Sequence, residues 1–282
     1  MPVRPLLTIG ISLYLCVTLS CTTIQKEIVT PAGPNPQGGT MRIQPNSVGA
    51  EIYTLRIGLN DNELLQRLWN ETDEQALPSN LRRELTAQGL RVGIIGNQTP
   101  PSLSQFLQNA GSIETTQSDN GAYQEIPVSD LTKEPAVTRQ FRNILQDMRI
   151  LVSPFDIPLP EYALFWNENG TITGQTLQNA SGILSIQAVA EKDASVTLTI
   201  IPELEYGTVF PKYRTQAGVV FCENVRPRRK LESLTIRQKL LPGQWIIIGA
   251  SSVDSTGVGK AFFFRNNTVV EQRIIALRLK GG

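Results

Sequence analysis

The sequence predicts an α+β protein, in which a small N-terminal α/β module precedes a larger, antiparallel, sandwich-like β-rich domain. Three observations predict this class. Apolar residues recur at helical spacing between about residues 61 and 111, and the helical signal then fades. Short β-type runs, often separated by Gly, Asn or Asp, continue to the C-terminus. Hydrophobic residues make up 40% of the chain and charged residues 18%, which is typical of a folded globular protein.

The first 20 residues have the features of a secretory signal peptide. Arg4 supplies a positive start, an apolar stretch runs from Pro5 to Leu19, and small residues precede Cys21. The apolar stretch is too short for a bilayer span, which needs about 20 residues. We therefore expect residues 1–20 to be a cleaved export signal.

The sequence Thr18-Leu19-Ser20-Cys21 resembles the bacterial lipobox, in which the cysteine is lipidated. Ser20 and Cys21 match that pattern, whereas Thr18 stands where leucine is usual. The resemblance implies a lipid on Cys21 that anchors the protein to a membrane. Small residues at Thr18 and Ser20 also suit ordinary signal peptidase, so simple secretion with a plain thiol at Cys21 is the alternative.

Residues 21–49 are rich in proline and glycine and predict a tether. They include Pro31, Pro34, Pro36 and Pro45. A flexible segment of this length places the following body roughly 30 Å from an anchor.

Residues 50–111 form the expected α/β module. Alternation in Glu51–Gly58 predicts a strand, and Leu90–Ile95 reads as a buried strand. We expect three helices, which begin at Asp61, near Pro78-Ser79 and at Pro100. Gly89 is well placed to end the second helix.

Residues 112–282 form the expected β-rich domain. The predicted strands are 148–153, 161–166, 171–177, 182–189, 195–201, 231–236, 245–249, 261–264 and 269–279. Asn169-Gly170 predicts a tight hairpin between two of these runs.

The chain contains no histidine, which excludes Ser-His-Asp and Cys-His catalysis and histidine zinc sites. Cys16 lies in the signal, so Cys21 and Cys222 remain in the mature protein, and no disulfide scaffold is expected. Cys222 follows an apolar run and is expected to be buried. We expect no cofactor, no metal and no enzymatic activity.

Two segments are candidate interaction surfaces. Arg226, Arg228, Arg229 and Lys230 form a basic cluster, which fits either a solvated loop between strands or contact with anionic lipid or nucleic acid. The formal net charge of +1 argues against nucleic acid. Phe262, Phe263 and Phe264 read as a strand that is buried on both faces or against a partner.

Glu203 and Glu205 are a candidate carboxylate pair on one face of a strand. Such a pair permits glycosidase-type chemistry, although two glutamates on a solvated face explain it too.

Three stretches of the C-terminal half together resemble part of the secretin core. They are Ser195–Leu204 with its Pro202-Glu203 step, Leu234–Leu240, and Leu241–Gly249 with its Gly-Gln step and Ile-Gly ending. The later Val-Pro and Gly-Asp-Ile-Pro segment of that family is missing, and Ser251–Lys260 stands in its place. The whole chain also resembles uncharacterised bacterial envelope proteins that have a signal, a tether and a strand like Gly89–Gly93.

The sequence leads us to expect an exported, lipid-anchored protein of the bacterial cell envelope that faces the periplasm or the cell surface. Its expected role is protein interaction or assembly with an envelope partner. A glycan- or peptidoglycan-binding β-module is the alternative, and a carboxylate-based hydrolase is the third. The sequence leaves the oligomeric state open.

Overall fold

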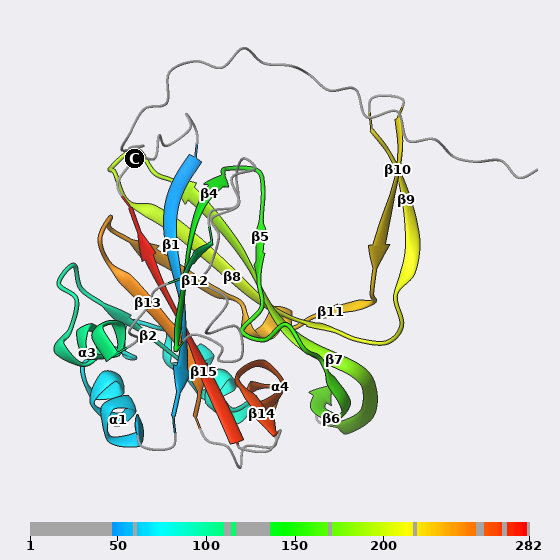
Figure 1. Cartoon of the computed structure of the whole chain (residues 1–282), viewed down its shortest axis with the longest axis horizontal. Coiled ribbons are helices and arrows are strands. Elements are labelled where there is room, and N and C mark those ends of the chain that lie inside the picture. The colour runs from blue at the N-terminus through cyan, green and yellow to red at the C-terminus, as the bar shows by residue number, and fades with distance from the viewer. Residues whose placement is uncertain are drawn as a thin grey trace, which may run out of the picture. The chain divides into compact units, whose positions relative to one another are not determined.

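Two sheets that consist mainly of antiparallel strands pack face to face (Figure 1). The structure is a computed structural model, and it describes residues 47–58, 61–109, 114–116, 136–168, 171–216, 219–251, 257–266 and 270–280. All of these residues belong to one compact unit, Arg42–Gly282. The expected β-rich, antiparallel character of the chain is therefore confirmed.

The elements have the following bounds. The strands are β1 (Ser47–Ile57), β2 (Leu90–Ile95), β3 (Glu114–Thr116), β4 (Val137–Leu145), β5 (Ile150–Val152), β6 (Leu159–Glu168), β7 (Thr171–Ala190), β8 (Val196–Glu205), β9 (Phe210–Gln216), β10 (Val219–Val225), β11 (Arg228–Lys230), β12 (Ile236–Leu240), β13 (Trp245–Ala250), β14 (Phe264–Asn266) and β15 (Val270–Leu279). The helices are α1 (Asn62–Asn70), α2 (Ser79–Ala87), α3 (Pro101–Asn109), α4 (Gly259–Phe263) and the 3-10 helix η3 (Glu232–Leu234).

The first sheet has the order β2-β13-β15-β1-β4-β3, with β14 beside β15. Its central strands are buried on both faces, which explains the continuous apolar run at the start of β13. Ile246 and Ile248 pack in the cluster between the two sheets, whereas Trp245 and Ile247 face the other side.

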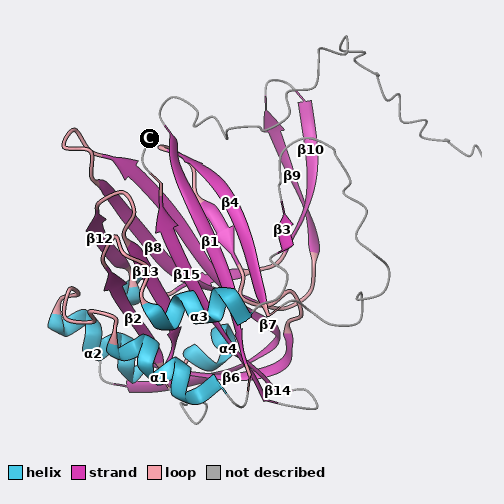
Figure 2. Ribbon diagram, turned by 60° about the vertical axis from the view of Figure 1, so that its left-hand side comes forward, coloured by secondary structure: helices cyan, strands magenta, loops and turns pink. Residues whose placement is uncertain are grey.

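Helices α1 and α3 cover the outer face of the first sheet (Figure 2). Leu64, Leu65, Leu68 and Trp69 of α1 are buried there, as their spacing predicts. Leu103 and Phe106 of α3 join the same cluster. The described part of the body therefore has three layers, with the first sheet between helices and the second sheet.

The second sheet has the order β11-β8-β7-β5, with β12 also beside β8 and β6 beside β7. The long strand β7 pairs with β6 through its first half and with β8 and β5 through its second half. Asn179 has φ 51°, a left-handed conformation that asparagine tolerates well, and it marks the change between these pairings. Glu168 pairs with Thr171, but Asn169 and Gly170 themselves lie outside the described residues.

Strands from both expected segments share the first sheet. β1 and β2 come from residues 50–111 as expected, yet they pair with β15 and β13 from the C-terminal part of the chain. β1 begins at Ser47, so the last residues of the expected tether belong to a strand. The signal, Cys21, residues 22–46 and the expected boundary at residues 111–112 lie outside the described residues.

Two of the strands predicted for the C-terminal half are wrong. Residues 261–264 mostly form the helix α4 instead of a strand, and residues 232–234 form η3 instead of the start of a strand. β4, β9 and β10 were not predicted. Within the described ranges, no helix is both long and apolar enough to cross a membrane.

Candidate functional site

The basic segment Arg226–Lys230 lies where the chain returns from β10 to the second sheet. Arg228 donates from Nε to Glu205 Oε1 at 2.9 Å. Arg226 Nη1 lies 4.0 Å from Glu205 Oε2, and it also donates to the backbone oxygen of Asn179 at 3.3 Å. Two cations of the segment therefore meet one carboxylate of the neighbouring strand.

The candidate pair Glu203 and Glu205 is engaged in ion pairs. Glu203 is 1% exposed, and Arg149 Nη1 lies 3.3 Å from its Oε1. Glu205 holds Arg228 and Arg226. The prediction of two solvated glutamates is therefore wrong for Glu203, and arginine partners occupy the carboxylates that a hydrolase would need as acid and base.

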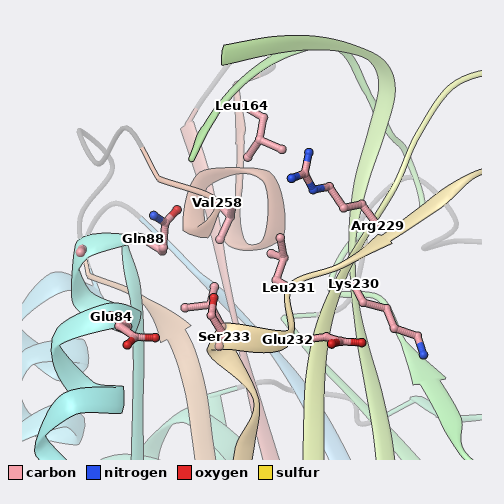
Figure 3. A pocket seen from close by; sticks show the side chains of 11 residues that line it. Glu84, Gln88, Leu164, Arg229, Lys230, Leu231, Glu232, Ser233 and Val258 are labelled. Carbon is pink, nitrogen blue, oxygen red and sulfur yellow. The ribbon is translucent and has the colours of Figure 1, made fainter. Parts of the chain in front are cut away.

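Arg229 and Lys230 line a cavity of about 530 Å³ between α2, η3, β6 and the start of α4 (Figure 3). Figure 3 shows the guanidinium of Arg229 near Leu164, whereas Lys230 extends away from Arg229. The lining residues are Glu84, Ala87, Gln88, Leu164, Arg229, Lys230, Leu231, Glu232, Ser233, Leu234 and Val258.

The cavity combines an apolar base with a charged rim. Leu164, Leu234 and Val258 are buried beneath it. Glu84 reaches it from α2, opposite the wall that carries Arg229. Its volume lies within the range of small-molecule sites, about 300–1,000 Å³. The arrangement suits a small ligand that has an apolar body and charged groups of both signs.

Phe262, Phe263 and Phe264 are buried and are not part of an exposed interaction surface. Phe262 and Phe263 are fully buried in α4, and Phe264 is 5% exposed. A Cβ on Gly182 of β7 would lie 2.3 Å from Phe262 Cγ, so this glycine permits the close approach of α4. Of the two expected alternatives, burial within the chain therefore applies and burial against a partner does not. Phe262 and Phe263 lie in a helix instead of the expected strand.

Several of the large exposed apolar residues lie on the hairpin β9–β10, which forms a two-stranded sheet of its own. Figures 1 and 2 both show this hairpin standing apart from the helices. The exposed fraction is 69% for Tyr213, 63% for Val220, 50% for Phe221 and 45% for Phe210. Exposed apolar groups in such a cluster mark interaction sites.

Both faces of the hairpin carry apolar groups, because directly opposite residues of paired strands share a face. Tyr213 pairs with Cys222 and Thr215 pairs with Val220, which places Tyr213 and Val220 on one face. Phe210 and Phe221 lie on the other. Cys222 is free and exposed, so its predicted burial is wrong. The only sequence signal for the exposed hairpin is the apolar run Val219–Phe221. The same run is equally typical of a buried core strand.

A buried charge cluster surrounds Glu51 at the start of the body. Glu51 is 2% exposed and accepts a hydrogen bond from Arg139, and Lys280 Nζ lies 3.1 Å from its Oε2. Burial alone raises the pKa of Glu51, but the hydrogen bonds and charges of Arg139 and Lys280 outweigh it and lower the pKa. No sequence pattern marks this cluster, because its members lie far apart in the chain.

A second buried charge is Arg265, which is 5% exposed. It donates to the backbone oxygens of Ile157, Ala261 and Phe264 at 3.0, 2.9 and 2.8 Å. Its guanidinium stacks on the ring of Phe155 at 4.2 Å. Burial, together with the nearby charge of Arg273, lowers the pKa of Arg265 to about 10.

The described residues contain no group of three or more acidic or cysteine side chains that could hold a metal ion. The stretches for which a resemblance to the secretin core was predicted lie in β8, in η3 and the adjacent β12, and in the turn before β13 together with most of β13. Comparison of the chain with protein-family models, with curated proteins and with solved structures finds no match.

Proposed function

We propose that this chain is an exported, lipid-anchored protein of the bacterial cell envelope that acts as an interaction or assembly module and not as an enzyme. The lipid on Cys21 holds it at a membrane facing the periplasm or the cell surface. The folded body then presents a docking element to an envelope partner.

The observation that carries this proposal is the exposed β9–β10 hairpin. Tyr213, Val220 and Phe221 are each at least half exposed, although these residue types are usually found in cores. A two-stranded hairpin alone is marginally stable in water, whereas three or more strands with an apolar face are stable. Binding of a partner to the hairpin would bury these side chains and stabilise it.

Fatty-acid labelling tests the anchor. Cells that express the wild-type chain or Cys21→Ala are labelled, and membrane and soluble fractions are compared. We expect label and membrane association for the wild type and neither for Cys21→Ala. A wild-type chain that takes up no label and appears in the soluble fraction would contradict the anchor.

Site-specific photo-cross-linking tests the docking element. A photoreactive amino acid replaces Tyr213 on the hairpin or, as a control, the exposed Arg237 on β12. Irradiation of intact cells should produce a discrete adduct from position 213 and none from position 237. The docking proposal is wrong if neither position gives an adduct or both give the same diffuse pattern.

The cavity favours a second candidate function, binding of peptidoglycan. Stem peptides carry amines and carboxylates, which match the rim charges of both signs at Glu84 and Arg229. This candidate predicts saturable binding of the protein to isolated cell-wall polymer. The double variant Glu84→Ala/Arg229→Ala should weaken that binding, and Arg237→Ala on the exposed side of β12 should not.

A further inference from the structure

The β9–β10 hairpin has two open edges in the described part of the structure. β9 and β10 pair with each other, and no other described strand pairs with either. Among the described strands each outer edge thus lacks a neighbour, and an edge of this kind is a template for strand addition.

The two edges differ in how well they can accept another strand. β9 contains Pro211, which has no N–H, and Lys212 follows it. Proline and lysine are devices that protect an edge from pairing. β10 contains no proline, and the four residues that precede its single charged residue, Glu223, are uncharged. The edge of β10 is therefore the competent one.

We propose that the partner at this edge is a second copy of this chain, which pairs β10 to β10 across a two-fold axis. The inference rests on the proposed docking role of the hairpin and names its partner. A two-fold axis makes the two strands antiparallel and requires a self-complementary edge.

An axis through Phe221 meets that requirement. Phe221 then lies opposite Phe221 of the second copy, and Val220 lies opposite its Cys222. Aromatic and β-branched cross-strand pairs of this kind stabilise a sheet. In this register Glu223 lies opposite Val219 of the second copy, so no two like charges of β10 face each other across the axis.

The combined sheet would have four strands instead of two. A sheet of four strands is stable in water, whereas a two-stranded hairpin alone is only marginally stable. Tyr213 and Val220 of both copies would line one face of this sheet, with Phe210 and Phe221 on the other. Anchoring also favours the same partner, because copies held at one membrane meet at a raised effective concentration.

Thiol cross-linking in intact cells tests this pairing, since Cys222 is free, exposed and next to the proposed axis. A short bismaleimide is added to cells that express the full chain. We expect a product of twice the monomer mass in the wild type and none in Cys222→Ser, which also controls for the thiol of Cys21.

A pair of edge variants separates strand pairing from accidental collision. Phe221→Lys puts a charge in the middle of the β10 edge and should reduce the cross-linked product by roughly tenfold. Thr215→Lys puts the same charge on the exposed strand β9, directly across the hairpin from Val220, and should leave the product unchanged. Circular dichroism of both variants should match the wild type.

The proposal is wrong if the wild type gives no dimer while N-ethylmaleimide labels Cys222, or if both lysine variants reduce the product equally. A photo-adduct from position 213 with a different protein or with lipid, in the absence of a bismaleimide dimer, would leave the docking role standing and overturn the second copy as its partner.

Discussion

Lys280 Nζ lies 3.1 Å from Glu51 Oε2 and so ties the end of the described chain to its first strand. Arg139 from β4 contacts the same carboxylate, and Lys280 donates from its backbone N–H to Gly49 at 2.8 Å. Glu51 therefore joins β1, β4 and the residue that follows β15. Its 2% exposure makes it an ion-pair centre in the body, not a surface charge.

Replacing Glu51 with glutamine should lower the free energy of unfolding at neutral pH. The loss comes from removing the ion pairs with Arg139 and Lys280, and it should be about 1–2 kcal/mol because the two cations can still be hydrated. Both cations are 38% exposed, which limits the penalty. Denaturant unfolding of Glu51→Gln measures it, with the exposed Glu161→Gln as a control that should change little.

The same pair of proteins should show a defined pH dependence. The pKa of Glu51 is lowered in the folded state below its ordinary value of 4.5, so its contribution to stability is present above the unfolded pKa. It is lost as the pH falls through the lowered folded pKa. The difference between wild type and Glu51→Gln should therefore be constant near pH 7 and shrink in acid below about pH 4. A difference that grows in acid would contradict the ion-pair role.

Gly182→Ala should destabilise the body by about 1–3 kcal/mol or more, because the added methyl group overlaps Phe262. The Cβ would lie 2.3 Å from Cγ and 2.7 Å from Cα of that residue. Gly96→Ala is the matched control, since a Cβ there meets nothing within 4 Å. Thermal unfolding of both variants gives the comparison, and equal melting temperatures would show that α4 does not pack on β7 as described.

Arg265→Met should be strongly destabilising although it removes a buried charge. The arginine satisfies three backbone oxygens, and each buried acceptor left without a donor costs about 1–3 kcal/mol. Arg237→Met on the exposed side of β12 should stay within about 0.5 kcal/mol of wild type. Denaturant midpoints with unchanged slopes would establish this difference, and similar midpoints for the two variants would refute it.

Truncation of Phe221 and of Phe262 should change the free energy of unfolding by very different amounts, because Phe221 is 50% exposed and Phe262 is fully buried. We expect Phe262→Ala to lose about 3–5 kcal/mol. Phe221→Ala should change the stability of the isolated body by less than about 0.5 kcal/mol. Chemical denaturation at low protein concentration checks both values, and a large loss for Phe221→Ala would place the hairpin inside the cooperative core.

Sequence patterns predicted the elements whose burial follows a regular period. Leu64, Leu65 and Leu68 mark one face of α1, and the run from Trp245 to Ile248 marks a strand buried on both sides. Gly89 ends the turn after α2 with φ 71°, as expected of a glycine at that place.

The failures have physical causes that one sequence does not reveal. α4 begins at Gly259, and a Cβ at Gly257 or Gly259 would lie within 2.2 Å of the backbone of Gln88 or Gly89. Tertiary packing therefore decides the conformation of the phenylalanines. β4 is mostly half-buried and polar, and it shows no clear alternation. The exposure of the hairpin depends on its place in the fold, since its apolar residues resemble those of a core strand.

The pairing of β1 with β15 also constrains the order in which the body is completed. Ala50 lies beside Leu279 in a continuous ladder, so the first strand of the body to be synthesised needs the last one as its neighbour. Pairing between such distant segments is slow, because closing the long intervening loop costs conformational entropy before the strands gain any contact. The central sheet therefore closes only after β15 has been synthesised, so β1 waits for its neighbour while most of the body is made.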